Sequence, residues 1–274
     1  MAFRESAEPS LGFAKRDIVR VKTGASYAER DLVADEVPVA MLYNDRSFAV
    51  MMATPADLVD FAIGFSLSEG LITDPAQLLD VKVIRLLEGI TLSMTVSEEA
   101  PATRLNPDAE RLLPGRGGCG ICGTRQLEDL VRPPPVLLHQ PHFLASAFQH
   151  ALETLSDHQP LNQATGSMHA AAWANSQGQI QLVREDVGRH NALDKLIGAL
   201  RRKGLHAHTG MLLISSRASY EMVTKAAAAG VALLAAVSAP TALAIDLARS
   251  AGMCLIGFAR PHGYNIYTYP ERLT

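Results

Sequence analysis

The sequence predicts an α/β protein, in which an α+β N-terminal part precedes a C-terminal block of βαβ units. Two observations carry this prediction. Short apolar runs separated by turn dipeptides fill the first hundred residues, and apolar runs alternate with helical segments in the last hundred. A chain of 274 residues, 48% of them hydrophobic, can bury one large core or two modest ones, which excludes a disordered protein.

The N-terminal part is predicted to contain antiparallel strands and one helix. Asn44-Asp45 and Glu88-Gly89 each separate two apolar runs, which is the pattern of a β-hairpin. Thr54 can cap a helix and Pro55 suits the first helical position. A core-facing helix is therefore expected from there to about Gly70.

Residues 101–136 have the composition of a long loop, dominated by Pro, Gly and Arg. They contain Cys119 and Cys122, flanked by Arg116 and Arg125. A thiolate is a nucleophile, and nearby positive charge lowers the pKa of a thiol. The glycines around the pair leave the sulfur atoms uncrowded. The segment is therefore predicted to be a mobile loop with a reactive thiol.

Three other interpretations of the cysteine pair are a structural zinc site, a thioredoxin-like redox pair and an inert loop. One C-x-x-C motif supplies two of the four ligands that zinc needs, and Cys254 lies in an apolar strand, where a core role is favoured. A redox pair opens a helix within a βαβ unit rather than a Pro/Gly loop. We therefore expect no bound metal.

The last hundred residues predict a parallel sheet. Apolar strands at 211–214, 231–237 and 253–258 alternate with helices at 221–229 and 238–251. Ligands bind at the carboxyl ends of such strands. Here these ends read Ser215-Ser216-Arg217, Ser238-Ala239-Pro240 and Ala259-Arg260-Pro261-His262-Gly263. A phosphate-bearing ligand is one interpretation, because helix N-termini favour anions, and ordinary capping and turn chemistry is the other.

Two further segments could contribute to a site. His169 is expected to start a helix, as the ligand histidine of zinc deaminases does, but Ala171 stands where their H-x-E motif has Glu, which disfavours deaminase chemistry. His169 is then either a ligand contact or a structural residue. Residues 183–191 are rich in charge, and form either a solvated junction capped by Asp186 or a binding or dimer-contact loop.

These segments together resemble the formate dehydrogenase accessory sulfurtransferase family, the FdhD-type sulfur carriers. The resemblance covers most of residues 36–273 in family order and is much more specific than the C-x-x-C motif alone. Gly166-Ser167, where the family has two glycines, is a mild departure beside His169. The matching segments are EVPVAMLYN, MMATPADLVDFAIGFSLSEGLI, GRGGCGICG, TGSMHAAAW, LVREDVGRHNALDKLIGAL, SSRASYEMVTKAAAAG, AVSAPTALAIDLA and GFARPHGYNIYTYPERL.

The resemblance implies a sulfur carrier that accepts persulfide sulfur from a cysteine desulfurase. It passes the sulfur to the molybdenum cofactor, in its bis-guanine-dinucleotide form, before insertion into formate dehydrogenase. Cys119 would carry the persulfide and Cys122 would assist. The alternative is a cofactor-binding chaperone whose cysteines are structural or bind zinc. The expected cofactor contacts are Phe258, Ala259, Arg260, Pro261, His262 and Gly263, joined by Ser216, Arg217 and His169.

The resemblance also implies a homodimer and a three-layer sandwich similar to cytidine deaminase. The predicted organisation is a flexible leader at 1–16, an α+β subdomain at 17–100, the mobile loop at 101–136 and a deaminase-like α/β domain at 137–274.

The composition bounds the partners and the compartment. A net charge of −3 argues against a protein that coats nucleic acid. No apolar run reaches the roughly 20 residues that a membrane helix needs, and no secretory signal opens the chain. Three cysteines suit a reducing compartment. We expect a cytoplasmic protein without nucleic-acid or membrane partners.

Overall fold

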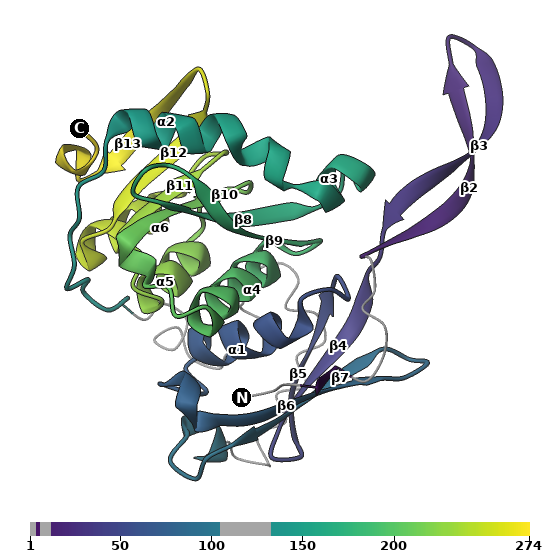
Figure 1. Ribbon diagram of the computed structural model, residues 1–274, viewed down its shortest axis with the longest axis horizontal. Helices are drawn as coiled ribbons and strands as arrows, with labels where there is room; N and C mark the ends of the chain where they lie inside the picture. The colour runs from purple at the N-terminus through teal and green to yellow at the C-terminus, as the bar shows by residue number, and fades with distance from the viewer. Residues whose placement is uncertain (1–3, 6–11, 105–132) are drawn as a thin grey trace.

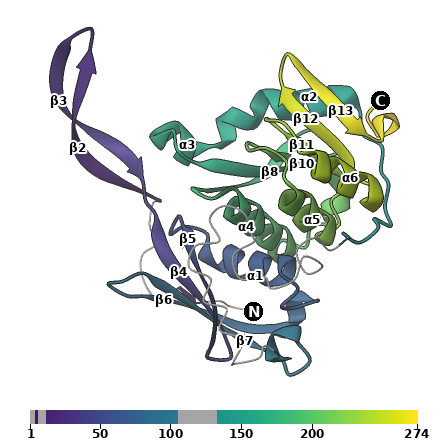
Figure 2. The same cartoon turned by 180° about the vertical axis from the view of Figure 1, so that it is seen from behind.

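The computed structural model describes residues 4–5, 12–104 and 133–274, which form a mixed α/β protein. Two sheets lie on either side of a layer of helices, and a two-stranded arm projects from the body (Figures 1 and 2). The predicted α/β class is confirmed.

The N-terminal sheet has five strands in the order β1-β6-β7-β4-β5. Helix α1 (Leu58–Ser68) covers one face, and the core between them is built of large apolar side chains such as Tyr43, Phe61 and Met94. Both predicted hairpins are confirmed, and at the first the left-handed backbone of Asn44 and Asp45 matches the twist of the strands. The strands are β1 (Arg4–Glu5), β4 (Val37–Tyr43), β5 (Arg46–Ala53), β6 (Leu78–Arg85) and β7 (Ile90–Val96), with short 3-10 helices at Pro75–Gln77 and Pro101–Arg104.

The C-terminal sheet has six strands in the order β13-β12-β11-β10-β8-β9. Its central strands β10, β11 and β12 run parallel, as predicted, because helices return the chain between them. The strands are β8 (His169–Asn175), β9 (Ile180–Asp186), β10 (Gly210–Ile214), β11 (Leu233–Ala236), β12 (Cys254–Arg260) and β13 (Gly263–Thr268).

Helices cover both faces of this sheet, so that it is the middle of three layers (Figure 1). On the face toward the N-terminal sheet lie α4 (Arg189–Arg202), α5 (Tyr220–Ala228) and α6 (Ala242–Ala251). On the other face lies α2 (Ala145–Thr154), which α3 (Pro160–Thr165) follows. Further 3-10 helices are Leu155–His158, Ala207–Thr209 and Pro270–Arg272. The likeness to cytidine deaminase stays a prediction, as do the domain boundaries at residues 100 and 136.

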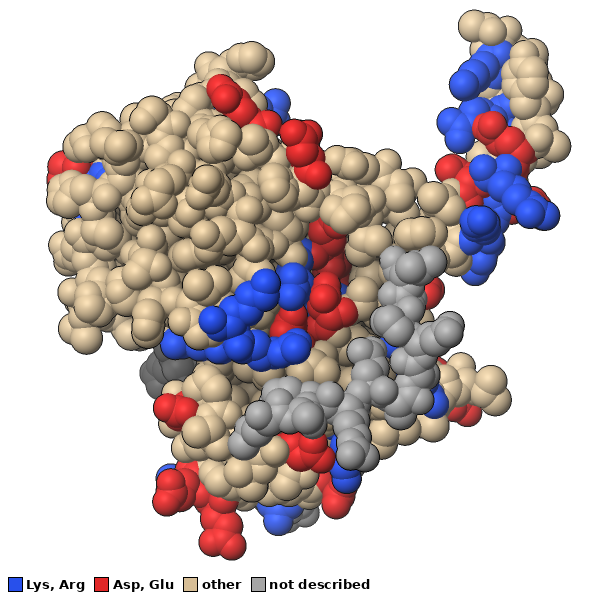
Figure 3. Space-filling view, viewed as in Figure 1, with Lys and Arg blue, Asp and Glu red and all other residues tan. Residues whose placement is uncertain are grey.

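Helices α1 and α4 join the two halves at a close contact, which we call the α1–α4 seam. A Cβ atom on Gly64 would lie 1.7 Å from the backbone oxygen of Asp194, and one on Gly198 would lie 1.9 Å from that of Asp60. Glycine at both positions therefore lets the two backbones approach. At the rim, Arg184 and Arg202 pair with Asp60 at 2.6 and 2.7 Å, and Figure 3 shows basic and acidic side chains side by side at this level.

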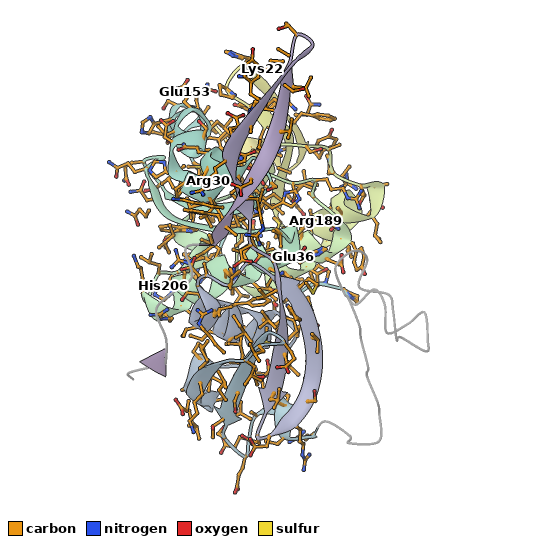
Figure 4. The ribbon with its side chains drawn as sticks, turned by 90° about the vertical axis from the view of Figure 1, so that its right-hand side faces the viewer. Lys22, Arg30, Glu36, Glu153, Arg189 and His206 are labelled. Atoms are coloured by element: carbon orange, nitrogen blue, oxygen red, sulfur yellow. The ribbon has the colours of Figure 1, made fainter. Side chains whose placement is uncertain are left out.

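Strands β2 (Phe13–Lys22) and β3 (Ala25–Ala34) form the arm, and among the described strands they pair only with each other. Figure 4 shows Lys22 near its tip and Arg30 part-way along it. Val19 and Val21, on one face of the arm, are 68% and 65% exposed. The rest of the described chain therefore does not cover the apolar surface of the arm. A two-stranded ribbon alone is only marginally stable in water.

Three local predictions are wrong. His169 starts a strand rather than a helix, because the small side chains after it pack between two helical layers as the buried strand β8. Thr54 does not cap α1; the helix begins after Asp57, and the Thr54 hydroxyl instead accepts from the amide of Val187. Strand β2 begins at Phe13, within the expected leader, where it pairs with Ala34 of β3.

Among the described helices, none is long and apolar enough to span a bilayer.

Candidate functional site

Two of the predicted contact segments meet at the carboxyl ends of the parallel strands. The amide of Ser238, after β11, donates to the backbone oxygen of Ser216, after β10, at 3.4 Å. The amide of Phe258 in β12 donates in turn to the oxygen of Ser238 at 3.1 Å. Backbone hydrogen bonds thus hold Ser216 and Phe258 along one edge of the sheet.

Phe258 has an unusual conformation for a large side chain. Its φ is 52°, in the left-handed region, and the residue is 46% exposed. The register with β13 shifts here, between Gly257 and Arg260, which marks a β-bulge. A Cβ at Gly257 would lie 2.6 Å from the ring of Pro240, so the backbones approach closely at this point. Residues held in this strained region of backbone conformation cluster at active sites and ligand clamps.

The rest of the predicted segment forms the turn between β12 and β13. Arg260, Pro261 and His262 are exposed, and Arg260 pairs with Gly263 across the turn. The side-chain amide of Gln149 on α2 donates to the Pro261 oxygen at 2.7 Å and anchors the turn. Ala259 differs, because its side chain is buried in the core.

A second group lies where β8 begins and β10 ends. The Ser215 hydroxyl accepts from the amide of Ala170 at 2.9 Å and lies 3.4 Å from Nδ1 of His169. Burial lowers the pKa of His169, and the charges of Arg189 and His190 lower it further. His169, which starts β8, therefore lies beside Ser216 and Arg217 at the end of β10, and only the last two were predicted at a strand end.

Sequence reasoning did not single out Arg189, His190 and Glu221. Arg189 opens α4, and Figure 4 places it near the level where the two halves meet. Nε2 of His190 lies 2.8 Å from Oε2 of Glu221, which is in the first turn of α5. The charged run at 183–191 was a signal for Arg189 and His190 but not for Glu221.

These groups influence one another electrostatically. Burial lowers the pKa of Arg189, and the positive charge of Arg217 lowers it further, while Glu221 opposes this. Burial alone would raise the pKa of Glu221. The hydrogen bond from His190 and the positive charges nearby outweigh burial, so the pKa of Glu221 is lowered. These charges belong to His190, Lys225 and Arg189. Three basic side chains, those of His190, Lys225 and Arg189, thus act on one carboxylate, that of Glu221.

Asp186 is not a solvated cap, and that interpretation is wrong. It is fully buried and accepts from the amides of Thr54 and Gly188 at 2.9 and 2.7 Å. Its carboxylate also lies 2.6 Å from Nζ of Lys195, which is buried too, and 2.9 Å from the side chain of Asn191. Asp186 therefore fixes the loop that leads into α4 and to Arg189.

The predicted persulfide residues Cys119 and Cys122 lie outside the described residues. Cys254 is described, as a buried residue of β12, and burial raises the pKa of its thiol to about 12. In the described ranges no cluster of three or more His, Cys, Asp or Glu side chains is arranged to hold a metal ion.

A family model described as "FdhD/NarQ family" matches residues 34–274. The chain belongs to this family. It is 52% identical to a protein of Xanthomonas euvesicatoria pv. vesicatoria (strain 85-10) over 96% of this chain and 92% of the relative, and 46% identical to one of Bordetella petrii over 93% and 92%. Both relatives are named "Sulfur carrier protein FdhD".

A solved structure shares the fold of this family member. It is a formate dehydrogenase accessory protein from Desulfotalea psychrophila, with a TM-score of 0.72 and 22% identity, covering 96% of this chain and 99% of the other.

Proposed function

We propose that this chain is a sulfur carrier for the molybdenum cofactor of formate dehydrogenase. The observation that carries the proposal is its likeness, over more than nine-tenths of its length, to relatives named as sulfur carriers. In this proposal Cys119 accepts sulfur from a cysteine desulfurase, in the cytoplasm, where thiols stay reduced. The bis-guanine-dinucleotide cofactor is the substrate, and the edge from Arg217 to Phe258 binds it.

The first transfer follows thiol–disulfide exchange. The Cys119 thiolate attacks the outer sulfur of the donor's persulfide, the donor S–S bond breaks and the donor cysteine leaves as a thiolate. Cys119 then holds the sulfur until the acceptor attacks the outer sulfur, which breaks the S–S bond and releases Cys119 as a thiolate. Cys122 assists. The described edge supports the binding step, since a strained exposed ring and basic groups suit a base and phosphates.

A mass-spectrometric experiment tests the sulfur transfer. The chain is incubated with a cysteine desulfurase and cysteine, and peptides are searched for one added sulfur atom. The expected result is added sulfur on Cys119, lost in Cys119→Ala and kept in the control Cys254→Ala, whose thiol is buried. If Cys119→Ala still restored formate dehydrogenase activity, the chain would be a cofactor-binding chaperone instead.

The active form in this proposal is a homodimer, and the arm supports this because Val19 and Val21 expose apolar surface. Light scattering of the double variant Val19→Lys/Val21→Lys is expected to give a monomer where the unmodified chain gives a dimer. Val136→Lys is the matched control, since Val136 is a 69% exposed valine outside the arm. If the double variant stayed dimeric, the arm would not be part of the dimer interface.

A further inference from the structure

Three histidine rings gather at the surface of the C-terminal half, just before β10 begins. The rings of His139 and His208 stack with their centroids 3.9 Å apart, and the centroids of His206 and His208 are 5.6 Å apart. His208 belongs to the short 3-10 helix that leads into β10. Figure 4 shows His206 on the other side of the molecule from Arg189 in that view, so the histidines lie away from the candidate edge.

Positive charge without a carboxylate partner lies beside these histidines. Helix α4 ends a few residues before them, where the amide of Gly204 donates to the oxygen of Arg201 at 3.1 Å and turns the chain. Arg201 and Lys203 are exposed, and among the described residues neither forms an ion pair. Burial lowers the pKa of His208, and the charges of the other two histidines lower it further. A carboxylate from another molecule would offset the repulsion among these groups.

Exposed apolar side chains lie on the segment that carries His139. Within it Leu137 is buried in the core, and its amide donates to the oxygen of Ala251 at 2.9 Å. Val136 and Leu138, on either side, are 69% and 92% exposed. Exposed apolar side chains rimmed by polar groups mark interaction sites. We call this surface the His139 patch; it comprises Val136, Leu138, Arg201, Lys203 and the three histidines.

The place of the patch in the chain favours the sulfur donor as its partner. The described chain resumes at residue 133, just before Val136 and after the segment that contains Cys119. A protein seated on the patch therefore meets this chain beside the segment whose thiol is proposed to accept its sulfur. A second copy is a poorer partner, because a two-fold contact would bring the like charges of two patches together.

We propose that the His139 patch docks the protein that donates the sulfur, through an acidic and partly apolar surface of that protein. Carboxylates of the donor pair with Arg201 and Lys203, and its apolar side chains cover Val136 and Leu138. This inference rests on the proposed function and names the surface that its donor uses.

The rate at which Cys119 gains sulfur tests the docking, with two donors compared. A cysteine desulfurase supplied with cysteine must dock, whereas inorganic polysulfide is small and need not. Leu138→Asp and Lys203→Glu are each expected to slow loading by the desulfurase about tenfold and to leave loading by polysulfide unchanged. The mass of the Cys119 peptide, followed in time, gives the rate. The matched controls, which should load normally, are Leu87→Asp at a 103% exposed leucine and Lys82→Glu at an exposed lysine of β6.

Ionic strength tests the charge of the donor's surface. Loading by the desulfurase should slow several-fold when the salt concentration rises from about 0.05 to 0.5 M, because salt screens exposed charges. The slowing should be smaller in Lys203→Glu. A rate that did not depend on salt would overturn the acidic character of the docking surface.

The remaining outcomes separate this inference from the proposed function. If both patch variants loaded from the desulfurase at the normal rate, the patch would be wrong while sulfur transfer survived. If loading from polysulfide slowed as well, the patch would act on the thiol and not in docking. If light scattering showed monomeric patch variants and a dimeric unmodified chain, a second copy would occupy the patch. If the unmodified chain gained no sulfur from either donor, the proposed function itself would fail.

Discussion

The α1–α4 seam and the β2–β3 arm use the same kinds of ion pair in opposite surroundings. At the seam, Lys195 and Asp186 lie 2.6 Å apart with side chains 0% exposed. On the arm, Arg30 and Asp17 lie 3.1 Å apart with side chains 77% and 87% exposed. Burial rather than distance distinguishes the two pairs.

This difference separates two roles of charge. A buried pair must be complete, because either partner alone is an uncompensated charge away from water. An exposed pair is screened by solvent and loses side-chain entropy when it forms. The seam ion pairs therefore specify how the two halves fit together, whereas those of the arm do little to fix its position.

The largest effect should follow from breaking the buried pair. Asp186→Ala leaves Lys195 charged and unneutralised, and we expect a loss of about 3–5 kcal/mol in the free energy of unfolding. Urea unfolding followed by circular dichroism measures it. The double variant Asp186→Ala/Lys195→Met should recover part of the loss, because it removes the buried charge. A loss below about 1 kcal/mol would mean that solvent reaches the pair.

A smaller effect is expected from adding a methyl group at the seam. Gly198→Ala places Cβ against the backbone oxygen of Asp60, so α1 and α4 must separate. Such overpacking typically costs about 1–3 kcal/mol, visible as a lower melting temperature. Arg201→Ala, at an exposed position in the last turn of α4, is the control, since it changes the same helix without adding an atom at the contact. Equal melting temperatures for Gly198→Ala and the unmodified chain would contradict the close contact.

Alkaline pH should act on the seam through Lys225. Burial lowers the pKa of Lys225, but the charges of Asp194 and Glu69 outweigh it and raise the pKa above the ordinary 10.5. A raised lysine pKa stabilises the fold fully below pH 10.5, and this stabilisation is lost as the pH rises through the folded-state value. Urea midpoints should therefore fall above pH 10.5, less steeply in Lys225→Met. Burial also raises the pKa of Tyr43, but Tyr43 is present in both the unmodified chain and Lys225→Met, so it does not cause a difference between their slopes. If the urea midpoints of the two proteins fell equally steeply with pH, Lys225 would not be the cause of the alkaline loss of stability.

The smallest effect is expected on the arm. Arg30→Ala removes the exposed pair with Asp17 and should change the free energy of unfolding by no more than about 1 kcal/mol, because solvent screens both charges. The same urea titration measures it, with Arg249→Ala as a second exposed-pair variant. A loss comparable with that of Asp186→Ala would show that the arm is part of the folded core.

The parallel sheet was predictable because its signal is local. Unbroken apolar runs and caps such as Thr241, whose side chain accepts from the amide of Ala244, define β10 to β12 and their helices from neighbouring residues alone. Strand β3 escaped prediction because its residues are mostly exposed and lack a buried face. The alanines after His169 favour a helix locally, and only burial between two layers makes them a strand.

The sequence predicted those residues of the candidate site that lie at the ends of predicted strands. Ser216, Arg217 and Phe258 follow directly from the order of strands and helices. The burial of Asp186 could not be predicted in this way, because its hydrogen-bond partner Thr54 lies 132 residues away in the sequence. Glu221 and His190 likewise meet only because α4 and α5 pack together.

The burial of Cys254 has a practical consequence for following the reaction. An alkylating dye added to the native chain at neutral pH should leave that sulfur unlabelled, while denaturant exposes it. The difference between the two labelling yields gives an internal standard in every sample, and the native yield then reads out the motif cysteines alone, without any need to remove the third one.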